Sequence, residues 1–369
     1  MRTCVSGATG FLGAHVARAL TERGDEVRVT YRDPERLTAL DGIRFRRAKT
    51  DVLDYRGMRR ALKGIEVVFH TAGFVGSTPT GKVWRINARA PVVVVEAAAA
   101  EGVRRVVITS TISAVGPAER GRPADEGRPY PDEWLGLTYA DSKHEGEEAA
   151  LEAGERHGVE VVIVNPAYVL GVPVNRSLPG ETSTRIVGNY LRGRLPGVID
   201  APMNFVDVED AALGQLLAAG RGSPGERYIL GGENLRWPEL IDEIASISGV
   251  HRPIVVVPPQ VTRLARVREA LDIPGPMSAE GYELMAQDWR FSSKKAEREL
   301  GYRARPLEET LRETTAWYQE LMEQGAFASE DSSVLAMLAR GLGAASGLGL
   351  LLPVRLGQRL TGRRVLAGI

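Results

Sequence analysis

The amino-acid sequence predicts an α/β protein with a doubly wound parallel sheet and a smaller interleaved α/β domain. Three observations support this fold. Short runs of β-branched residues, typical of buried parallel strands, alternate with helical segments from the first residues onward. A glycine-rich turn joins the first strand to the first helix. The length of 369 residues suits about two domains, or one large domain with a cap.

The strand and helix patterns follow in regular order along the first half of the chain. Strands are expected at 2–6, 26–31, 67–70, 105–109 and 159–165, and helices near 12–23, 55–62, 88–101 and 138–156. This alternation predicts the parallel sheet, because a crossover connection must join neighbouring parallel strands. After Asn165-Pro166, a loop rich in Pro, Gly and Ser covers 171–184. The later elements expected are helices near 184–193, 209–220, 237–248 and 306–323, and strands at 205–208 and 227–230.

The composition excludes several classes of protein. Hydrophobic residues make up 43% of the chain and charged residues 25%, which is typical of a globular protein and not of a disordered one. The 47 basic residues are balanced by 47 acidic residues, whereas a general nucleic-acid binder needs a basic excess. The sequence has no signal-like segment and no apolar run of membrane-spanning length, so we expect a cytoplasmic protein.

The residue types that bind metals show no pattern of a site. The single cysteine, Cys4, excludes an internal disulfide and a cysteine-rich zinc site. Cys4 lies in the first predicted strand, where we expect a buried apolar side chain rather than a reactive thiol. The five histidines are scattered without ligand spacing. We therefore expect no metal.

The turn after the first strand has the composition of a phosphate-binding loop. Its sequence is Gly7-Ala8-Thr9-Gly10-Phe11-Leu12-Gly13, and it opens the first helix. Small residues let the turn tighten and bring backbone N–H groups close to a pyrophosphate, whose negative charge the helix dipole favours. The turn therefore predicts a dinucleotide site.

The glycine spacing GxxGxxG, followed downstream by Tyr139-Ala140-Asp141-Ser142-Lys143, resembles the extended short-chain dehydrogenase/reductase family. The resemblance runs to about residue 323. Other motifs of the family follow in its order: Asp51-Val52, His70-Thr71-Ala72-Gly73, Asn87, Thr109-Ser110-Thr111, Asn165-Pro166 and Phe205-Val206-Asp207-Val208-Glu209-Asp210. The resemblance implies a Rossmann-type nucleotide-binding domain (1–165 and about 205–220) and a substrate-binding cap (166–204 and 221–325). Residues 326–369 remain as a basic, Leu/Gly-rich extension.

The resemblance also implies which residues hold the cofactor. Asp51 would bind the adenine amino group with Val52 beside the ring; capping a loop or helix is the alternative role of Asp51. Ala72 and Gly73 would line the ribose side of the cofactor. The expected contacts are Gly7, Thr9, Gly10, Phe11, Leu12, Gly13, Arg32, Asp51, Val52, Thr71, Ala72, Gly73, Lys143, Pro166 and Val169, of which Pro166 and the residues after it would bound the nicotinamide.

The end of the second predicted strand, Val29-Thr30-Tyr31-Arg32-Asp33, favours NADP(H) over NAD(H). NAD enzymes usually carry an acidic residue there, which binds the 2′-hydroxyl of the ribose. Here the position holds Tyr31 or Arg32, and a guanidinium suits a 2′-phosphate. We expect Arg32 to bind that phosphate, with Arg36 as a second contact. The alternative is a solvated Arg32, with Asp33 on the ribose.

Tyr139 and Lys143 are four residues apart, so they share one face of a helix. An ammonium group one turn away, together with an oxidised nicotinamide, is expected to lower the pKa of the phenol and make it an acid/base. We predict that Tyr139 protonates the substrate oxygen and that Lys143 also holds the nicotinamide ribose. Thr111 occupies the hydroxyl position where the family usually has serine. Ser113 is the second choice, and Ser110 is expected to bond the strand-end backbone.

Three stretches, 31–34, 227–234 and 295–310, resemble the branch of the family that is dihydroflavonol 4-reductase-like and hopanoid-associated epimerase-like. This branch implies an NADPH-dependent reductase of a ketone or aldehyde, which in reverse is an alcohol dehydrogenase. Because an epimerase recycles a tightly held NAD, the NADP preference favours net reduction. The alternatives are a nucleotide-sugar epimerase or dehydratase, and a non-catalytic NADP-binding sensor.

The side chains expected around the substrate are mostly apolar. Phe74, Tyr168 and Phe205, with the hydroxyl of Ser113, suggest a pocket for a hydrophobic or aromatic small molecule, and a place in the core is the alternative. A nucleotide sugar would instead need cationic groups for its diphosphate. The arginines available for that role are Arg176, Arg185, Arg192 and Arg194.

Residues 332–369 contain five arginines and no acidic residue, so the rest of the chain has a net charge of −5. We expect this segment to form a pair of helices that packs on the body or on a second subunit. Contact with an anionic membrane surface is the less favoured alternative. The family resemblance implies a homodimer formed through the helices near 88–101 and 138–156.

Overall fold

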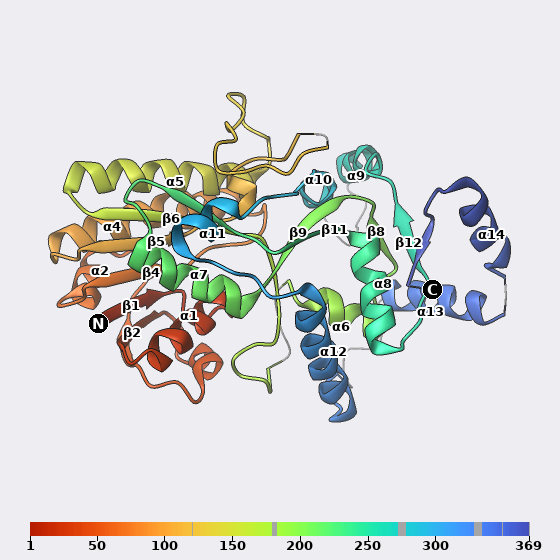
Figure 1. The fold of residues 1–369 in the computed structure, drawn as a ribbon, viewed down its shortest axis with the longest axis horizontal. Coiled ribbons are helices and arrows are strands. Elements are labelled where there is room, and N and C mark those ends of the chain that lie inside the picture. Colours follow the sequence, from red (N-terminus) through yellow and green to blue (C-terminus); the bar gives the residue numbers. More distant parts are fainter. Residues whose placement is uncertain (120, 179–182, 272–277, 328–333, 349, 369) are drawn as a thin grey trace.

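The computed structural model describes residues 1–369 except 120, 179–182, 272–277, 328–333, 349 and 369. A central sheet of seven strands has the order β10-β6-β5-β4-β1-β2-β3 (Figure 1). Its strands are β1 (Arg2–Ser6), β2 (Glu26–Tyr31), β3 (Arg46–Lys49), β4 (Val67–His70), β5 (Arg105–Thr109), β6 (Glu160–Pro166) and β10 (Arg227–Leu230). Every pairing between them is parallel, which confirms the predicted doubly wound sheet.

Helices cover both faces of the sheet, and each face has its own apolar core. On one face lie α1 (Phe11–Glu22) and α7 (Val208–Arg221), and on the other α2 (Tyr55–Leu62), α4 (Ala90–Ala100) and α5 (Thr138–His157) (Figure 1). Shorter helices between them are η1 (Glu35–Leu40), α3 (Thr80–Trp84), η2 (Arg85–Arg89) and η3 (Ile112–Ala114). The inner strands β4, β5 and β6 are covered on both sides, so their sequences are continuous apolar runs rich in β-branched residues, whereas the edge strand β3 is mostly exposed and has no such run.

Cys4 lies in β1 and is fully buried in the core under α2 and α4. Burial raises the pKa of its thiol to about 12. The thiol is therefore protonated at neutral pH and behaves as a small apolar side chain. This confirms the prediction of a buried rather than a reactive cysteine.

The cap has two small sheets, with the strand orders β11-β9-β7 and β13-β12-β8. Their strands are β7 (Tyr168–Leu170), β8 (Gly197–Ile199), β9 (Pro202–Asp207), β11 (Glu233–Arg236), β12 (Ile254–Val257) and β13 (Leu366–Ala367). The helices of this half are α6 (Arg185–Leu191), α8 (Trp237–Ser248), α9 (Val261–Ala270), α10 (Ala279–Ala286), α11 (Lys294–Leu300) and α12 (Leu307–Glu323). Its core is aromatic, with Trp237, Trp289 and Trp317 almost completely buried.

Two segments of the expected cap lie with the nucleotide-binding domain instead. β10 extends the central sheet by pairing in parallel with β6, and α11 packs on β10 and α7. In the sequence both segments lie between cap elements. In the structure β10 joins the central sheet because it pairs with the otherwise unpaired edge of β6. The cap is therefore more finely interleaved than a division at residue 221 implies.

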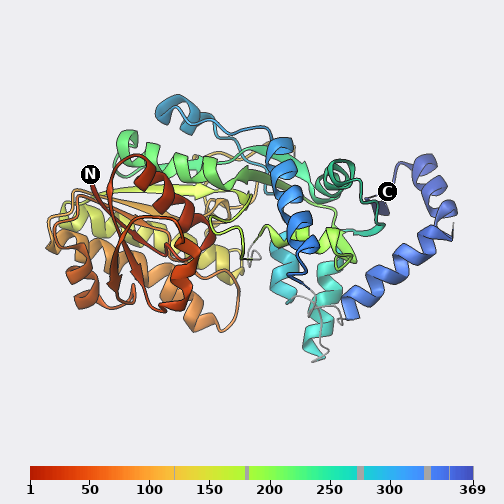
Figure 2. The ribbon, with the colours of Figure 1, turned by 90° about the horizontal axis from the view of Figure 1, so that it is seen from below.

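The C-terminal extension forms the expected pair of helices, α13 (Val334–Gly347) and α14 (Leu352–Thr361), before the chain returns to the cap as β13. Both views show the pair standing away from the body at the end opposite the nucleotide-binding domain (Figures 1 and 2). Among the described residues, no helix is long and apolar enough to cross a membrane.

Candidate active site

The glycine-rich turn has a backbone that only glycine fits. Gly7 has a φ of +82°, and a Cβ at that position would lie 2.4 Å from the backbone nitrogen of Ala72. A Cβ at Gly13 would lie 2.3 Å from the carbonyl oxygen of Gly7. α1 begins after Gly10, and no side chain caps it. The N–H groups of its first turn are thus left for a ligand, as the pyrophosphate prediction requires.

Arg32 and Asp51 lie together at the ends of β2 and β3. Nη1 of Arg32 is 3.4 Å from Oδ2 of Asp51, and the Arg32 side chain is 62% exposed. The other oxygen of Asp51 accepts a hydrogen bond from the backbone of Leu53 (2.9 Å). Asp33 accepts from the backbone of Glu35 (3.0 Å) at the start of η1. This bond uses only one oxygen of Asp33, which also lines the cavity beside the glycine-rich turn, whereas Arg32 pairs with Asp51 outside that lining.

A cavity of about 570 Å³ opens beside the glycine-rich turn. It reaches from the turn to α6 and the end of α12, and Arg36, Arg185 and Arg192 are among its lining residues. Residues 173–175 and Leu178 form one wall. Residues 179–182 of the predicted loop lie outside the described part of the chain. Two of the four arginines proposed for a diphosphate thus line the same cavity as the turn.

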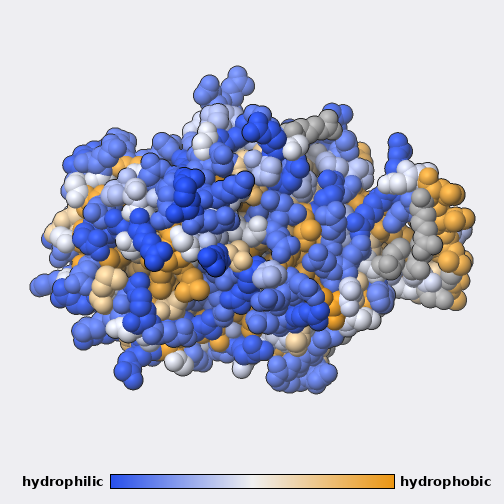
Figure 3. All heavy atoms as spheres, viewed as in Figure 1, coloured by the Kyte–Doolittle hydropathy of each residue, from blue (hydrophilic) through white to orange (hydrophobic). Residues whose placement is uncertain are grey.

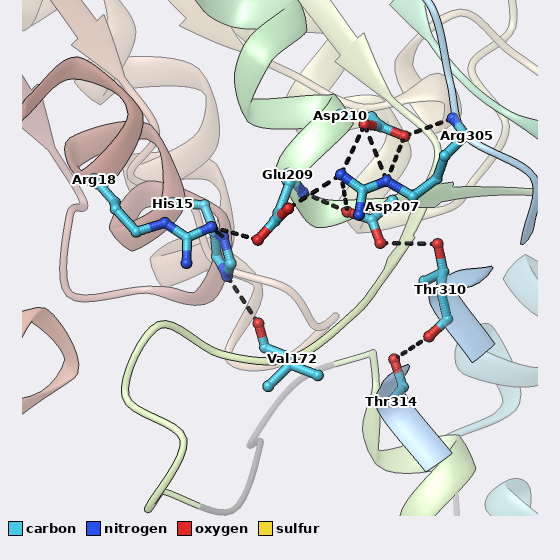
Figure 4. Close-up of polar contacts among 9 residues, drawn as sticks. All are labelled: His15, Arg18, Val172, Asp207, Glu209, Asp210, Arg305, Thr310 and Thr314. Atoms are coloured by element: carbon cyan, nitrogen blue, oxygen red, sulfur yellow. Dashed lines mark hydrogen bonds and ion pairs between the residues drawn. The ribbon is translucent and has the colours of Figure 1, made fainter. Parts of the chain in front are cut away.

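The loop at 171–178 is tied down on several sides. His15 of α1 donates from Nε2 to the carbonyl of Val172 (2.9 Å), as Figure 4 shows. Asn175 donates to the carbonyl of Thr38 (2.8 Å), and the indole of Trp317 donates to the carbonyl of Arg176 (2.7 Å). The loop is therefore a fixed wall that joins α1, η1 and α12.

The predicted catalytic side chains meet where β5 ends. Tyr139 and Lys143 lie on the first two turns of α5, and Thr111 lies close enough to the Tyr139 hydroxyl to influence its pKa. Thr111 Oγ1 also donates to Ser113 Oγ (3.4 Å). The buried Lys143 donates from Nζ to the carbonyl of Thr109 (3.0 Å). A Cβ at Gly73 would lie 3.0 Å from this Nζ, so the ribose-side loop borders the lysine.

The pKa values at the site are set by burial. Burial raises the pKa of Tyr139, and the hydrogen bond with Thr111 opposes it. In the protein alone, desolvation of the phenol dominates, so the pKa of Tyr139 is raised; the predicted lowering by Lys143 together with an oxidised nicotinamide stays a prediction. Burial lowers the pKa of Lys143 to about 8, against the attraction of Glu147. At neutral pH Tyr139 therefore carries its proton, as an acid must.

A buried polar cluster behind Lys143 has no place in the sequence-based prediction. Glu147, one turn after Lys143, is fully buried and accepts from Nδ2 of Asn165 (2.6 Å). The same amide lies 2.9 Å from the carbonyl of Thr111 and donates to it. Nη2 of Arg227 is 3.2 Å from the other oxygen of Glu147. The cluster fixes Thr111 relative to α5. Its only signal in the sequence was the position of Glu147 four residues after Lys143, which places both on one face of the helix.

Three further polar residues shape the strand ends. Asn87 accepts from the N–H of Phe74 and donates to its carbonyl (2.9 Å each), so it holds the loop after β4. His70 is bonded through Nδ1 to Ser6 Oγ (2.7 Å), and burial lowers its pKa to about 3. Ser110 differs from expectation: its buried hydroxyl has no hydrogen-bond partner among the described residues.

The proposed substrate residues differ in exposure. Phe74 is half-buried, and Nζ of Lys82 lies 4.4 Å from the centre of its ring. Tyr168 is half-buried and donates to the carbonyl of Ser183 (3.1 Å). Phe205 is fully buried, packed edge-on against Tyr168 and Trp237. Phe205 therefore supports Tyr168 from behind instead of facing an open pocket.

Acid is expected to destabilise the protein through His15. Because Nε2 donates to Val172, Nδ1 is unprotonated and accepts from Arg18 (3.2 Å). Burial, and next the charge of Arg18, lower the pKa of His15 to about 4. In the unfolded chain the histidine binds a proton near pH 6.5, whereas in the folded chain it does so only near pH 4. The free energy of unfolding therefore decreases as the pH falls from about 6.5 to about 4. His70 contributes in the same direction.

Thermal unfolding at about pH 7 and about pH 5 measures this effect. The Tm should be lower at the acidic pH, and His15→Gln, which keeps a donor but cannot titrate, should reduce the decrease. His251→Gln, at an exposed position, is the matched control and should leave the decrease unchanged. Equal decreases for wild type and His15→Gln would refute the assignment.

Comparison with known proteins agrees with this geometry. Residues 3–231 match the model of the NAD dependent epimerase/dehydratase family. The chain is 32% identical to sterol demethylase protein B of Methylococcus capsulatus over 330 residues, 87% of this chain and 99% of the relative. It is 31% identical to a putative dihydroflavonol 4-reductase of Synechocystis sp. over 327 residues, 85% of this chain and 94% of the relative.

Among solved structures, a nucleoside-diphosphate-sugar epimerase from Pseudomonas aeruginosa superposes with a TM-score of 0.72 at 26% identity. The superposition covers 87% of this chain and 98% of that one. Members of the family and its structural neighbours act with a nicotinamide dinucleotide. The chain belongs to the NAD dependent epimerase/dehydratase family, the extended branch of the short-chain dehydrogenases/reductases.

Proposed function

We propose that this protein is an NADPH-dependent reductase of a ketone or aldehyde. The observation that carries the proposal is the position of Thr111 near the hydroxyl of Tyr139, whose pKa it lowers, beside the buried Lys143. Two hydroxyls at one point provide an acid and a second donor for a single carbonyl oxygen. The similarity to a putative dihydroflavonol 4-reductase supports a reductase.

The residues present fit a dinucleotide. The cradle at Gly7 and Gly13 has no room for a Cβ, and the first turn of α1 offers uncapped N–H groups to a pyrophosphate. Asp51 and Val52 would take the adenine, and Lys143 beside Gly73 would take the nicotinamide ribose. When bound, the nicotinamide supplies the hydride.

The chain's own groups perform the proton chemistry. Thr111 holds the substrate oxygen by a hydrogen bond, and Tyr139 gives it a proton as negative charge develops there. The raised pKa of Tyr139 keeps that proton in place until it is needed. Lys143, fixed by the carbonyl of Thr109, keeps a positive charge near the reacting centre below about pH 8.

Arg32 is proposed to select NADPH. Its mostly exposed guanidinium lies at the end of β2 beside Asp51, and Asp33 is held by η1. Replacing Arg32 by Ala should raise the KM for NADPH about tenfold or more, since a charge-assisted bond to the 2′-phosphate is lost, and should leave the KM for NADH nearly unchanged.

Arg46→Ala is the matched control, because Arg46 is a similarly exposed arginine that pairs with Glu26 (3.6 Å) in the same sheet. It should leave both KM values unchanged. A wild-type protein that prefers NADH, or an Arg32→Ala variant with an unaltered KM for NADPH, would contradict the proposed cofactor.

The proposed substrate is a hydrophobic or aromatic carbonyl compound. The half-buried rings of Phe74 and Tyr168 support an apolar pocket. NADPH oxidation with a panel of aromatic and aliphatic ketones and aldehydes tests this class. We expect turnover with aromatic members, and turnover with none of the panel would contradict the proposal.

A nucleotide-sugar epimerase is the second candidate function. It is favoured by Arg185 and Arg192, which line the cavity beside the glycine-rich turn, and by the similarity to a nucleoside-diphosphate-sugar epimerase. Incubation with UDP- and dTDP-sugars, followed by chromatography of the products, separates the two candidates. Interconversion of a sugar without net consumption of NADPH would favour the epimerase.

A further inference from the structure

The outer surface of the C-terminal helix pair is apolar and uncovered. Along α14, Leu352, Leu356 and Leu360 recur every four residues, so they form a single stripe, and they are 63%, 60% and 78% exposed. Leu348 and Leu350, in the connection before α14, are 77% and 66% exposed. Figure 3 shows this apolar surface at the outer end of the pair. Side chains of this size seldom gather on a surface that has no partner.

The position of the helix pair is fixed by β13. This strand pairs with β12 of the cap, and Leu366 is buried there. The carboxylate of Asp242 pairs with Arg364 and accepts from the N–H of Gly368 (2.7 Å). Gln358 of α14 accepts from the N–H groups of Val365 and Leu366 (2.8 and 2.9 Å). The helix pair is thus attached to the cap through the residues that follow α14, and the leucine side chains of α14 remain exposed to solvent.

The charge of the segment indicates what covers the leucines. Residues 332–369 carry five arginines and no acidic residue. A helix that combines an apolar stripe with basic residues, and that is too short to span a bilayer, lies at an anionic lipid surface. At such a surface leucines enter the acyl region, and the phosphate groups attract basic residues.

We propose that α13 and α14 bind the surface of an anionic phospholipid bilayer. The helix pair projects beyond the body, so a flat surface reaches the leucines without meeting the rest of the protein (Figures 1 and 2). The proposal does not depend on the reaction, because the helix pair lies at the end of the molecule opposite the nucleotide-binding domain.

A second copy of the chain is a less suitable partner for the leucine stripe. In a two-fold symmetric contact between two helix pairs, the same patch faces itself. Each patch belongs to a segment with five arginines and no acidic residue of its own, and of these arginines Arg364 pairs with Asp242 of the cap. Such a contact opposes like charges, whereas an anionic bilayer neutralises them.

Co-sedimentation of the full chain with lipid vesicles tests the proposal. The probes are vesicles of phosphatidylcholine with one-third phosphatidylglycerol, and vesicles of phosphatidylcholine alone. We expect binding to the first, weaker binding to the second, and weaker binding at high salt. Leu356→Ser with Leu360→Ser should weaken binding to the anionic vesicles about 100-fold, since each buried leucine is worth at least about tenfold.

The matched control is Leu264→Ser with Leu271→Ser on α9, where the leucines are 69% and 64% exposed. It should bind vesicles like the wild type, and both double variants should bind NADPH like the wild type, which reports an intact fold. Wild-type protein that stays in the supernatant, or an α9 variant that loses binding equally, overturns the proposal. Another outcome also overturns the proposal: light scattering shows a wild-type dimer that does not bind vesicles, and the α14 double variant is a monomer.

Discussion

Replacing Tyr139 by Phe is expected to abolish turnover and leave the binding of NADPH intact. The hydroxyl is the proposed proton donor, and loss of a general acid costs about 10²–10⁴-fold in kcat. The aromatic ring still fills the first turn of α5, so the cofactor contacts do not change. Steady-state NADPH oxidation measures kcat, and fluorescence titration measures the Kd for NADPH.

The matched control for this variant is Tyr190→Phe. The hydroxyl of Tyr190 donates to the carbonyl of Val250 (2.8 Å) in the cap, far from the catalytic side chains. Its loss should leave kcat within a few fold of the wild type. A Tyr139→Phe variant with full kcat would show that another group delivers the proton.

Replacing Arg305 by Met is expected to lower the free energy of unfolding by about 3–5 kcal/mol. Arg305 precedes α12, and its guanidinium contacts three carboxylates at the start of α7 (Figure 4). Its Nη2 lies 3.0 Å from Glu209 and 3.2 Å from Asp210, and Asp207 is 3.8 Å away. Without the cation, the nearly buried carboxylates of Asp207 and Asp210 lose their ion-pair partner, whereas Glu209 keeps Arg18. Urea unfolding gives the change in free energy.

Arg312→Met is the control, because Arg312 pairs with Glu308 on the exposed face of α12. An exposed pair of this kind contributes under about 1 kcal/mol. Adding Asp210→Asn to Arg305→Met should recover part of the lost stability, since it removes one of the unpaired charges. Equal losses for the two single arginine variants would refute the role of the carboxylate cluster.

Local patterns in the sequence were enough to predict the parallel sheet and much of the candidate site. The strands of the larger domain follow from short apolar, often β-branched runs, except β3, whose sequence Arg-Arg-Ala-Lys contains none. The glycine-rich turn follows from its spacing, because it depends on neighbouring residues. The joint position of Tyr139 and Lys143 follows from the helical period. Arg32 and Asp51 lie together because parallel strands end at one edge of the sheet.

The remaining features depend on contacts between distant parts of the chain. Glu147 of α5 meets Asn165 of β6, and Arg305 meets Asp210 from 95 residues away. No local pattern encodes such pairs. The raised pKa of Tyr139 follows from burial, which depends on the complete fold. The exposure of the α14 leucines could not be predicted from the sequence either, because an apolar helical pattern is the same whether or not another element covers the helix.

The fate of the hydride tests the central claim most directly. NADPH carrying deuterium at the transferred position is incubated with an aromatic ketone or aldehyde, and the product is analysed by mass spectrometry. We predict that the deuterium appears on the former carbonyl carbon, in an amount equal to the NADP⁺ formed. If no deuterium enters a carbonyl product, and the protein supplied with the oxidised cofactor interconverts a nucleotide sugar, the protein is an epimerase and the proposed reduction is wrong.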